Sequence, residues 1–344
     1  MARSRGPRVT LSTVADHVGV SRSTVSNAYN HPDQLSAEMR RKILDAADEL
    51  GYAGPDPAAR SLRQGRAGAI GLVQKNLVWA VADAANQLLL TGVAEVCEEH
   101  GLALVLIPLG RPDGETADVL RSTALDGVIA HCDGLDAERR KILRDRGMPL
   151  VIVDGVPDES VDFVGVDDVG GADAAAQHLL DLGHRRLAIV GIGAREGLAT
   201  TVTRWRFEGY ARALARVQLT LDDVVVVEGG TSSRASGRVA AERLLAVSPR
   251  PTGVLAMSDE VAAGVLDVAI ELGISVPDEL SIVGFDDSST ATDVTPALTT
   301  VHQDHRTKGA LAARMLLDQT ASPRHEQLET RLVVRGSTAP APTY

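Results

Sequence analysis

The chain of 344 residues has few cysteines and no long apolar run. Cys97 and Cys132 are too few for a disulfide framework and lack the spacing of a metal-ligand set, so we expect both to be reduced core residues. No apolar run approaches the length of a membrane-spanning helix, so we expect no membrane partner. The basic N-terminus lacks the apolar segment of a signal peptide, so we expect the protein in the cytoplasm.

Motifs that support catalysis are also missing. The chain has no G-x-S-x-G, no phosphate-binding G-K-[ST] and no C-x-x-C. The glycines at 191–197 are similar to a dinucleotide-binding loop, but the third glycine is one residue late and no acidic residue follows at the required distance. His302, Asp304 and His305 lack a second cluster that would complete a metal site. We therefore expect no enzyme activity, no cofactor and no metal.

Aromatic residues are scarce, and acidic residues outnumber basic ones. Aromatic residues make up 3% of the chain, so few rings are available to stack on a sugar. The formal net charge is −11, but the charge is unevenly placed: residues 1–66 contain ten Lys or Arg and seven Asp or Glu. A basic first segment on an acidic remainder would confine nucleic-acid contacts to that first segment.

The stretch from Val9 to Asn30, VTLSTVADHVGVSRSTVSNAYN, has the spacing of a helix-turn-helix. Ala15 is small where the two helices would cross, and Val25 would close the contact from the second helix. Gly19 tolerates the positive φ that the turn needs. This spacing predicts two short helices that meet at a steep angle.

The capping residues agree with this prediction. Thr10 or Ser12 can cap the first helix, and Ser21 can cap the second. The outer face of the second helix would then carry polar side chains that could enter a DNA major groove. These are Arg22, Ser23, Ser26 and Asn27. The alternative is an ordinary solvated helix pair.

Two further segments complete this region. Ser36 opens a third helix that ends at Gly51, which predicts a small three-helix bundle. The linker AGPDPAARSLRQGRAG contains PAARSL, which is too short to be helical unless it packs against something. Leu62 between Arg60 and Arg63 is typical of a minor-groove wedge with phosphate contacts. A plain solvated linker is the alternative.

From Ala69 onward, short apolar runs alternate with helical segments. The runs predicted as strands are AIGLV, ALVLIPL, GVIAH, LVIVD, FVGV, RLAIVGI, VVVVEG, GVLAM and LSIVGF. Apolar strands that alternate with helices indicate parallel sheets covered on both faces. The strands are too many for one compact sheet, so we expect an α/β core of two doubly wound subdomains with a cleft between them.

Several long motifs resemble the lac repressor family of bacterial transcriptional regulators over nearly the whole chain. The helix-turn-helix, ARSLRQGR, GVDDVGGADAAAQHLLDLGHRRLAIV, RFEGYARAL, VPDELSIVGFDD, PALTTVHQD and RLVVRGST occur in the family's order. The resemblance implies an all-α DNA-binding head at 1–53, a hinge helix or linker at 54–66, and a periplasmic-binding-protein-like core at 67–338. The subdomain ranges that it implies are about 67–166 with 303–320, and about 167–302 with 321–338.

The resemblance also implies a function. It implies a repressor that binds double-stranded, near-palindromic operator DNA as a homodimer. A small molecule, a sugar or another metabolite, would bind the cleft and change operator affinity through the hinge. The alternative from another class is a solute-binding protein without DNA function, which would need a signal peptide and no DNA-binding head.

Individual positions match the family's functional sites. The DNA-contacting positions are Thr10, Ser21, Arg22, Ser23, Thr24, Asn27 and Asn30 in the head and Ala59 and Leu62 in the hinge. The effector-contacting positions are Lys75, Asp154, Arg206, Ser258, Asp286 and Gln303. Carboxylates and a guanidinium can hold hydroxyls or a ligand charge by directed hydrogen bonds. The alternatives are loop capping for the two aspartates and a surface position for the arginine.

One segment departs from the family pattern. After the first predicted core strand, the chain has KNLVWAVADAANQ, which is longer than the Asn-Pro-Phe-Phe-like segment of many members. Trp79 in this segment either supplies aromatic stacking in the effector site or packs in the core. With so few aromatic residues, the identity of the effector stays open.

Overall fold

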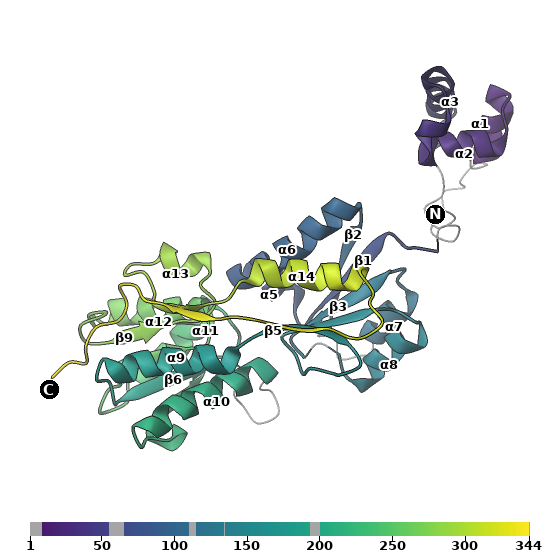
Figure 1. The fold of residues 1–344 in the computed structure, drawn as a ribbon. Helices are drawn as coiled ribbons and strands as arrows, with labels where there is room; N and C mark the ends of the chain where they lie inside the picture. Colours follow the sequence, from purple (N-terminus) through teal and green to yellow (C-terminus); the bar gives the residue numbers. More distant parts are fainter. Residues whose placement is uncertain (1–8, 55–64, 110–114, 134, 193–199, 344) are drawn as a thin grey trace. The chain divides into compact units, whose positions relative to one another are not determined.

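The computed structural model describes residues 9–54, 65–109, 115–133, 135–192 and 200–343. The chain forms two compact units, Met1–Ala67 and Gly68–Tyr344 (Figure 1). The predicted hinge residues Ala59 and Leu62 lie outside the described residues. Within the described part of the chain, no helix combines the length and the apolar character needed to cross a membrane.

Residues 9–54 of the first unit form a head of three α-helices. α1 (Leu11–Val18) and α2 (Arg22–Asn30) are joined by a turn at Gly19, whose φ is 77°. A positive φ at this position is what the spacing predicts, because glycine adopts it without steric cost. A single 3₁₀ turn, η1 (Pro32–Gln34), leads to α3 (Ala37–Glu49). The predicted helix-turn-helix and third helix are therefore confirmed.

Caps and a small core hold the head together. Thr10, Ser21 and Ser36 are the N-caps of α1, α2 and α3, and each side chain accepts a bond from a backbone N–H of its helix. The buried apolar residues of the head are Val14, Ala15, Val25, Ala28, Ile43, Ala46 and Ala47. Because these positions recur at helical spacing, the polar faces of the helices point to solvent.

The second unit contains a six-stranded parallel sheet in the order β11-β5-β4-β3-β1-β2. Its strands are β1 (Ala69–Gln74), β2 (Ala103–Pro108), β3 (Gly127–His131), β4 (Leu150–Val153), β5 (Asp162–Val166) and β11 (His325–Leu328). Its helices are α5 (Leu77–Ala82), α6 (Ala84–His100), α7 (Glu115–Ser122), α8 (Ala137–Asp145) and α14 (His305–Leu317). α6 and α14 cover one face and α7 and α8 the other (Figure 1). We call this part the first subdomain.

The second subdomain is built around a four-stranded parallel sheet in the order β7-β6-β8-β9. Its strands are β6 (Leu187–Gly191), β7 (Val225–Glu228), β8 (Gly253–Ala256) and β9 (Ser281–Val283), with an antiparallel pair of β10 (Thr300–His302) and β12 (Arg331–Val333) beside them. Its helices are α9 (Asp168–Asp181), α10 (Thr201–Arg216), η2 (Leu221–Asp223), α11 (Arg234–Leu245), α12 (Asp259–Glu271) and α13 (Ser289–Asp293). α9 and α10 cover one face, and α11 and α12 the other.

The chain passes between the subdomains three times, after β5, after β10 and after β11. The predicted placement of 321–338 in the second subdomain is wrong for His325–Leu328, because this strand pairs in parallel with β5 of the first sheet. Its sequence HEQL is mostly polar and exposed, as an edge strand can be, so it carries no apolar signal. The nine strands predicted from apolar runs are all present.

Glycines allow the helices of the first subdomain to pack closely. A side chain at Gly92 of α6 would overlap the backbone carbonyl of Arg306 in α14. A side chain at Gly309 of α14 would in turn overlap the carbonyl of Leu89 in α6. The two helices therefore cross with backbone against backbone. α14 is the first element after the chain crosses back from the second subdomain. Its contact with α6 therefore anchors the chain in the first subdomain directly after this crossover.

The carboxyl ends of both sheets point to one place. Lys75 follows β1, Cys132 follows β3 and Asp154 follows β4, while Ser258 and Asp286 follow β8 and β9 by two or three residues. In doubly wound sheets, ligands bind outside the carboxyl ends of the strands. The fold thus brings polar residues from both subdomains to one cleft.

Candidate functional site

The exposed face of α2 carries the residues predicted to contact DNA bases. Arg22 and Ser23 are exposed at its start, and Asn27 is half-buried one turn later. Asn27 Nδ2 donates to Gln34 Oε1 of η1 at 3.0 Å, so Gln34 adjoins this face although sequence reasoning missed it. A guanidinium and an amide are the groups that pair with guanine and adenine in the major groove.

The other predicted head positions have structural partners. Ser21 Oγ accepts from the Thr24 N–H at 3.1 Å, and Thr10 Oγ1 accepts from an N–H in the first turn of α1 at 3.4 Å. Asn30 Nδ2 donates to the carbonyl of Ser26 at 3.0 Å. Thr10 and Ser21 therefore lie at helix N-termini, where DNA phosphates commonly bind.

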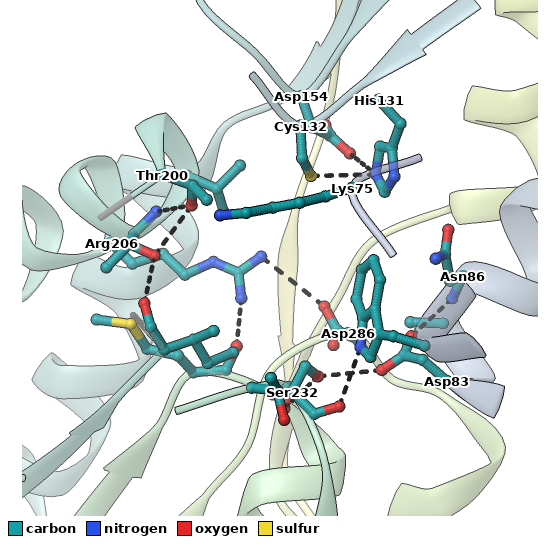
Figure 2. Close-up of a pocket in the computed structure, with 18 of the residues that line it drawn as sticks. Lys75, Asp83, Asn86, His131, Cys132, Asp154, Thr200, Arg206, Ser232 and Asp286 are labelled. Carbon is teal, nitrogen blue, oxygen red and sulfur yellow. Dashed lines mark hydrogen bonds and ion pairs between the residues drawn. The ribbon is translucent and has the colours of Figure 1, made fainter. Parts of the chain in front are cut away.

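A cavity of about 410 Å³ lies between the two subdomains of the second unit (Figure 2). Every predicted effector position lines it: Lys75, Trp79, Asp154, Arg206, Ser258, Asp286 and Gln303. Trp79 is half-buried in the cavity wall, so it does not belong to the core. Figure 2 places the His131, Cys132 and Asp154 group at one end of this space and Asp83 and Ser232 at the other.

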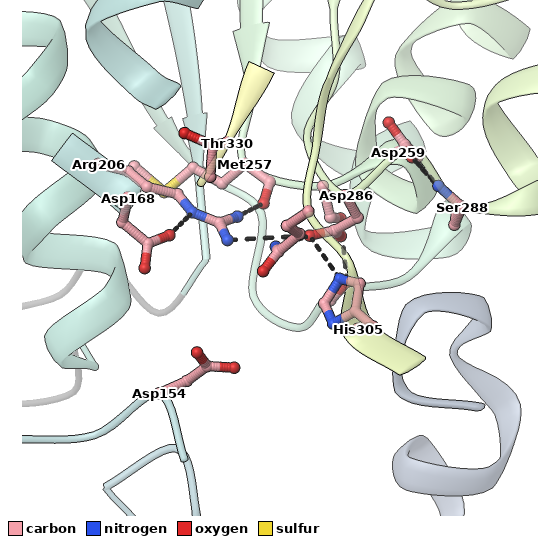
Figure 3. A network of polar contacts seen from close by, with 12 residues as sticks. Asp154, Asp168, Arg206, Met257, Asp259, Asp286, Ser288, His305 and Thr330 are labelled. Atoms are coloured by element: carbon pink, nitrogen blue, oxygen red, sulfur yellow. Dashed lines mark hydrogen bonds and ion pairs between the residues drawn. The ribbon is translucent and has the colours of Figure 1, made fainter. Parts of the chain in front are cut away.

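Arg206 of α10 is held from several sides (Figure 3). Its Nε donates to Asp168 Oδ1 at 2.8 Å, its Nη1 donates to the Met257 carbonyl, and its Nη2 lies 3.8 Å from Asp286 Oδ1. The guanidinium also lies 3.6 Å from the ring centroid of Phe285. Burial alone would lower the pKa of Arg206, but the two carboxylates raise it above its ordinary value. The side chain is therefore a fixed cation and is not a surface arginine.

A buried lysine connects the two subdomains. Lys308 of α14 is fully buried, and its Nζ donates to Asp154 Oδ2 at 2.5 Å and to Gln303 Oε1 at 2.9 Å. Gln303 Nε2 donates in turn to Asp286 Oδ1 at 2.6 Å. Burial alone would raise the pKa of Asp154, but Lys308 and His131 hold it well below its usual range. The chain of polar contacts therefore runs from β4 to the loop after β9.

Cys132 and His131 adjoin Asp154 at the end of β3. Cys132 Sγ lies 3.3 Å from His131 Nε2, which lies 3.4 Å from Asp154 Oδ2. Burial lowers the pKa of His131, but Cys132 and Asp154 raise it, and the net value is about 10. Cys132 is only half-buried and lines the cavity, so its predicted place in the core is wrong, whereas Cys97 is buried as expected.

Asp83 lies where α5 meets α6 and reaches the second subdomain. Its Oδ1 accepts from the Asn86 N–H at 2.8 Å, and its Oδ2 accepts from Ser232 Oγ at 3.0 Å. Trp79 Nε1 also donates to the Ser232 carbonyl at 3.0 Å. Burial, with the nearby charge of Asp286, raises the pKa of Asp83 to about 6. These bonds join the subdomains at one end of the cavity.

A second contact joins them near the other end. Asp133, which follows β3, accepts bonds from the N–H and the hydroxyl of Thr201 at 2.6 and 2.8 Å. Thr201 is the first residue of α10, so a carboxylate of one subdomain binds the positive end of a helix in the other. The structure therefore shows the cleft bridged on both sides of the cavity.

Strained backbone is concentrated at this site. Cys132, Asp154 and Asp286 line the cavity and have φ values of 48°, 54° and 112°. Residues other than glycine rarely adopt positive φ, and such residues collect at functional sites. The strained residues Cys132, Asp154 and Asp286 therefore coincide with the cavity lining.

Sequence reasoning missed several residues of the cavity and its wall. These are Asp83, Asn86, His131, Cys132, Asp168, Ser232, His305 and Lys308. One signal was available: Lys308 precedes Ala312 and Met315 by four and seven residues, so it lies on the buried face of its helix. A lysine on such a face needs a buried partner.

The chain matches two family models. Residues 10–54 match the bacterial regulatory proteins of the lacI family, and residues 176–338 match a periplasmic binding protein-like domain. A transcriptional regulator of the helix-turn-helix type from Mycolicibacterium smegmatis is 36% identical, with 99% of this chain and 100% of the relative covered.

Solved structures are similar in fold as well. The complex of the transcriptional regulator CelR with cellobiose has a TM-score of 0.70 at 31% identity, covering 96% of this chain and 100% of that one. The lac repressor dimer bound to operator and an anti-inducer has a TM-score of 0.80 at 25% identity, covering 97% and 100%. The head, the two-subdomain core and these matches agree, and the chain belongs to the lacI family of helix-turn-helix transcriptional regulators.

Proposed function

We propose that this regulator is a repressor that binds a near-palindromic operator as a homodimer and responds to a neutral, polyhydroxylated small molecule. The exposed guanidinium of Arg22 and the amide of Asn27 support contacts with base edges, together with Ser23. The cap positions Thr10 and Ser21 support phosphate contacts. The lac repressor dimer on its operator supplies the precedent for two heads on two half-sites.

The remaining DNA contacts rest on the family resemblance. Thr24 and Asn30 are proposed to lie near phosphates. Ala59 and Leu62, outside the described residues, are proposed to enter the minor groove at the operator centre. The regulator would act in the cytoplasm and catalyse no reaction.

The charges of the cavity argue against an anionic effector. Arg206 pairs with Asp168 and approaches Asp286, and Lys308 pairs with Asp154. The carboxylates that line the cavity outnumber its lysine and arginine residues, Lys75 and Arg206; they are those of Asp83, Asp154, Asp168 and Asp286. An anionic ligand would need cations with charge to spare, whereas an uncharged ligand can donate hydroxyl hydrogens to carboxylates and accept from the guanidinium. The CelR complex with cellobiose is consistent with an uncharged sugar.

Three unpartnered polar atoms are the observation that carries this proposal. Asp154 Oδ1, Asp168 Oδ2 and Asn86 Nδ2 are buried and make no hydrogen bond among the described residues, and all three residues line the cavity. A buried polar atom without a partner costs roughly 1–3 kcal/mol. Ligand hydroxyls, which both donate and accept, would satisfy two acceptors and a donor at once.

Selection of random duplex DNA on the full-length protein at fixed salt tests the DNA part. We expect a near-palindromic consensus, and we expect Arg22→Ala to relax the base preference at one position of each half-site. The matched control is Arg212→Ala, an exposed arginine on α10 of the core, which should leave the consensus unchanged. Recovery of no consensus from the wild type would contradict a sequence-specific regulator.

A thermal-shift screen of two ligand panels tests the effector part. One panel contains neutral sugars and polyols, and the other contains sugar phosphates and carboxylated metabolites. We expect stabilisation by a member of the neutral panel, lost in Arg206→Ala and retained in Arg212→Ala. Stabilisation by anionic compounds alone would contradict the proposed chemical class.

A further inference from the structure

We propose that His131, Cys132 and Asp154 form a binding site for a divalent transition metal of the zinc class in the cavity wall. Their ligand atoms, an imidazole nitrogen, a sulfur and a carboxylate oxygen, all lie within 4.8 Å of one another. His131 is the last residue of β3, Cys132 follows it, and Asp154 follows the neighbouring parallel strand β4. The three side chains are therefore positioned by adjacent strand ends.

The distances agree with tetrahedral coordination. His131 Nε2 lies 3.3 Å from Cys132 Sγ and 3.4 Å from Asp154 Oδ2. Bonds of about 2.0 Å to nitrogen and oxygen and about 2.3 Å to sulfur place neighbouring ligands about 3.3–3.6 Å apart around a tetrahedral zinc ion. Both His131 distances therefore match this spacing, and the third pair, Cys132 with Asp154, lies within 4.8 Å.

A buried glutamine holds the His131 ring in the orientation that a metal ligand needs. Gln74 is fully buried, and its Nε2 donates to Asn86 Oδ1 at 3.2 Å, which orients its Oε1 as an acceptor. That oxygen lies 3.1 Å from His131 Nδ1, so Nδ1 carries the hydrogen and Nε2 faces Cys132 and Asp154. Histidines that bind metals characteristically donate their other N–H to such a partner.

Asp154 has a free ligand atom and a fixed orientation. Lys308 Nζ holds Oδ2 at 2.5 Å, while Oδ1 is buried without a hydrogen-bond partner. At the distance given above, the ion would bind Oδ2, so it would share this oxygen with the Lys308 ammonium group and leave Oδ1 free. The added positive charge is tolerable because carboxylates are plentiful around the cavity, where Asp83, Asp168 and Asp286 also lie.

The site would be open on one side. Cys132 is half-buried and lines the cavity with His131 and Asp154, so the protein supplies three ligands and the cavity supplies the fourth position. Three protein ligands with one open position are typical of zinc that binds an exogenous molecule. Water or a ligand hydroxyl would complete the coordination.

Cobalt titration of the full-length, chelator-treated protein tests this proposal, because a Co²⁺–thiolate bond gives a charge-transfer absorption that oxygen and nitrogen ligands do not. We expect this absorption to saturate at one Co²⁺ per chain and Zn²⁺ to abolish it by displacement. Cys132→Ser should remove the absorption and weaken Zn²⁺ binding at least tenfold. Cys97→Ala, which removes the buried cysteine outside the cavity, should change neither.

His131→Gln provides a second variant in case Cys132→Ser fails to fold, and it should also weaken Zn²⁺ binding at least tenfold. No thiolate absorption in the wild type, or unchanged absorption and affinity in these variants, would overturn the site. Metal binding is measured without DNA or effector, so its failure is distinguishable from failure of the proposed regulatory function.

Discussion

At the scale of single residues, the most informative side chain is Lys308. It is fully buried in an apolar helix face, yet its ammonium group has two partners, Asp154 and Gln303. A buried charge is tolerated only when it is paired and hydrogen-bonded. Lys308 therefore couples the stability of the first subdomain to the geometry of the cavity.

Replacement of Lys308 by methionine should be strongly destabilising. Lys308→Met keeps the volume of the side chain but removes the closer partner of the buried Asp154 carboxylate and leaves it only His131, 3.4 Å away. We expect the free energy of unfolding to fall by about 3–5 kcal/mol in urea denaturation. Lys141→Met, which removes a lysine from an exposed pair with Asp145, should cost less than about 1 kcal/mol. Equal, small effects of the two changes would contradict the role assigned to Lys308.

Asp83 should make the stability of the core depend on pH. Its pKa is raised to about 6 in the folded protein by burial and by the charge of Asp286, and Glu260 raises it further. The folded state therefore binds the proton more tightly than the unfolded state does. The charge of Asp83 disfavours folding above about pH 6, and this penalty fades as the pH falls toward about 4.

Asp83→Asn mimics the protonated carboxyl at every pH. At pH 8 the free energy of unfolding of the variant should exceed that of the wild type by about 1–3 kcal/mol. This difference should shrink below pH 6. Urea denaturation between pH 5 and 8 measures this. Asp222→Asn, at an exposed position of η2, is the matched control and should show no such trend. A variant less stable than the wild type at pH 8 would mean that the charged form is the favoured one.

The candidate site could be predicted only in part from single positions. Asp154, Arg206 and Asp286 were predicted from motifs, and all three line the cavity. His131 and Cys132 were not, because they are 22 to 23 residues from Asp154 in sequence and only the pairing of β3 with β4 brings them together. A pattern of local spacing cannot reveal ligands that a parallel sheet assembles.

At the scale of elements, the apolar strands were the most predictable feature. β1, β3 and β6, for example, are buried along their whole length in a parallel sheet, so their sequences are nearly continuous apolar runs. β10 and β11 were missed because TVH and HEQL carry no such run. Their positions depend on strand partners that are distant in sequence, β12 and β5.

The crossing of α6 and α14 gives a prediction for an element pair. Gly92→Ala would place a methyl group against the carbonyl of Arg306, so the helices must separate. We expect the free energy of unfolding to fall by about 1–3 kcal/mol, even though alanine has a higher helix propensity than glycine. Thr91→Ala, at the exposed neighbouring position, should change it by less than about 0.5 kcal/mol. A stabilising effect of Gly92→Ala would show that the helices are not in close contact.

At the scale of the whole molecule, the cavity lies between the two subdomains, so a bound ligand can change how they are arranged relative to each other. Asp83 and Trp79 bond to Ser232 on one side, and Asp133 bonds to Thr201 on the other. A ligand that binds between these contacts would favour one arrangement of the subdomains over others. Because the chain carries a lacI-family DNA-binding head, the arrangement of the subdomains would control affinity for DNA.

Reciprocal linkage between operator and effector tests this account most directly. Operator affinity is measured at fixed salt with and without the effector found in the neutral panel, and effector affinity is measured with and without operator. We expect both affinities to change by the same factor, about 5- to 150-fold, and we expect Arg206→Ala to abolish the effector-dependent change in operator affinity. If both ligands bind the wild type and neither changes the affinity of the other, the cavity does not control DNA binding.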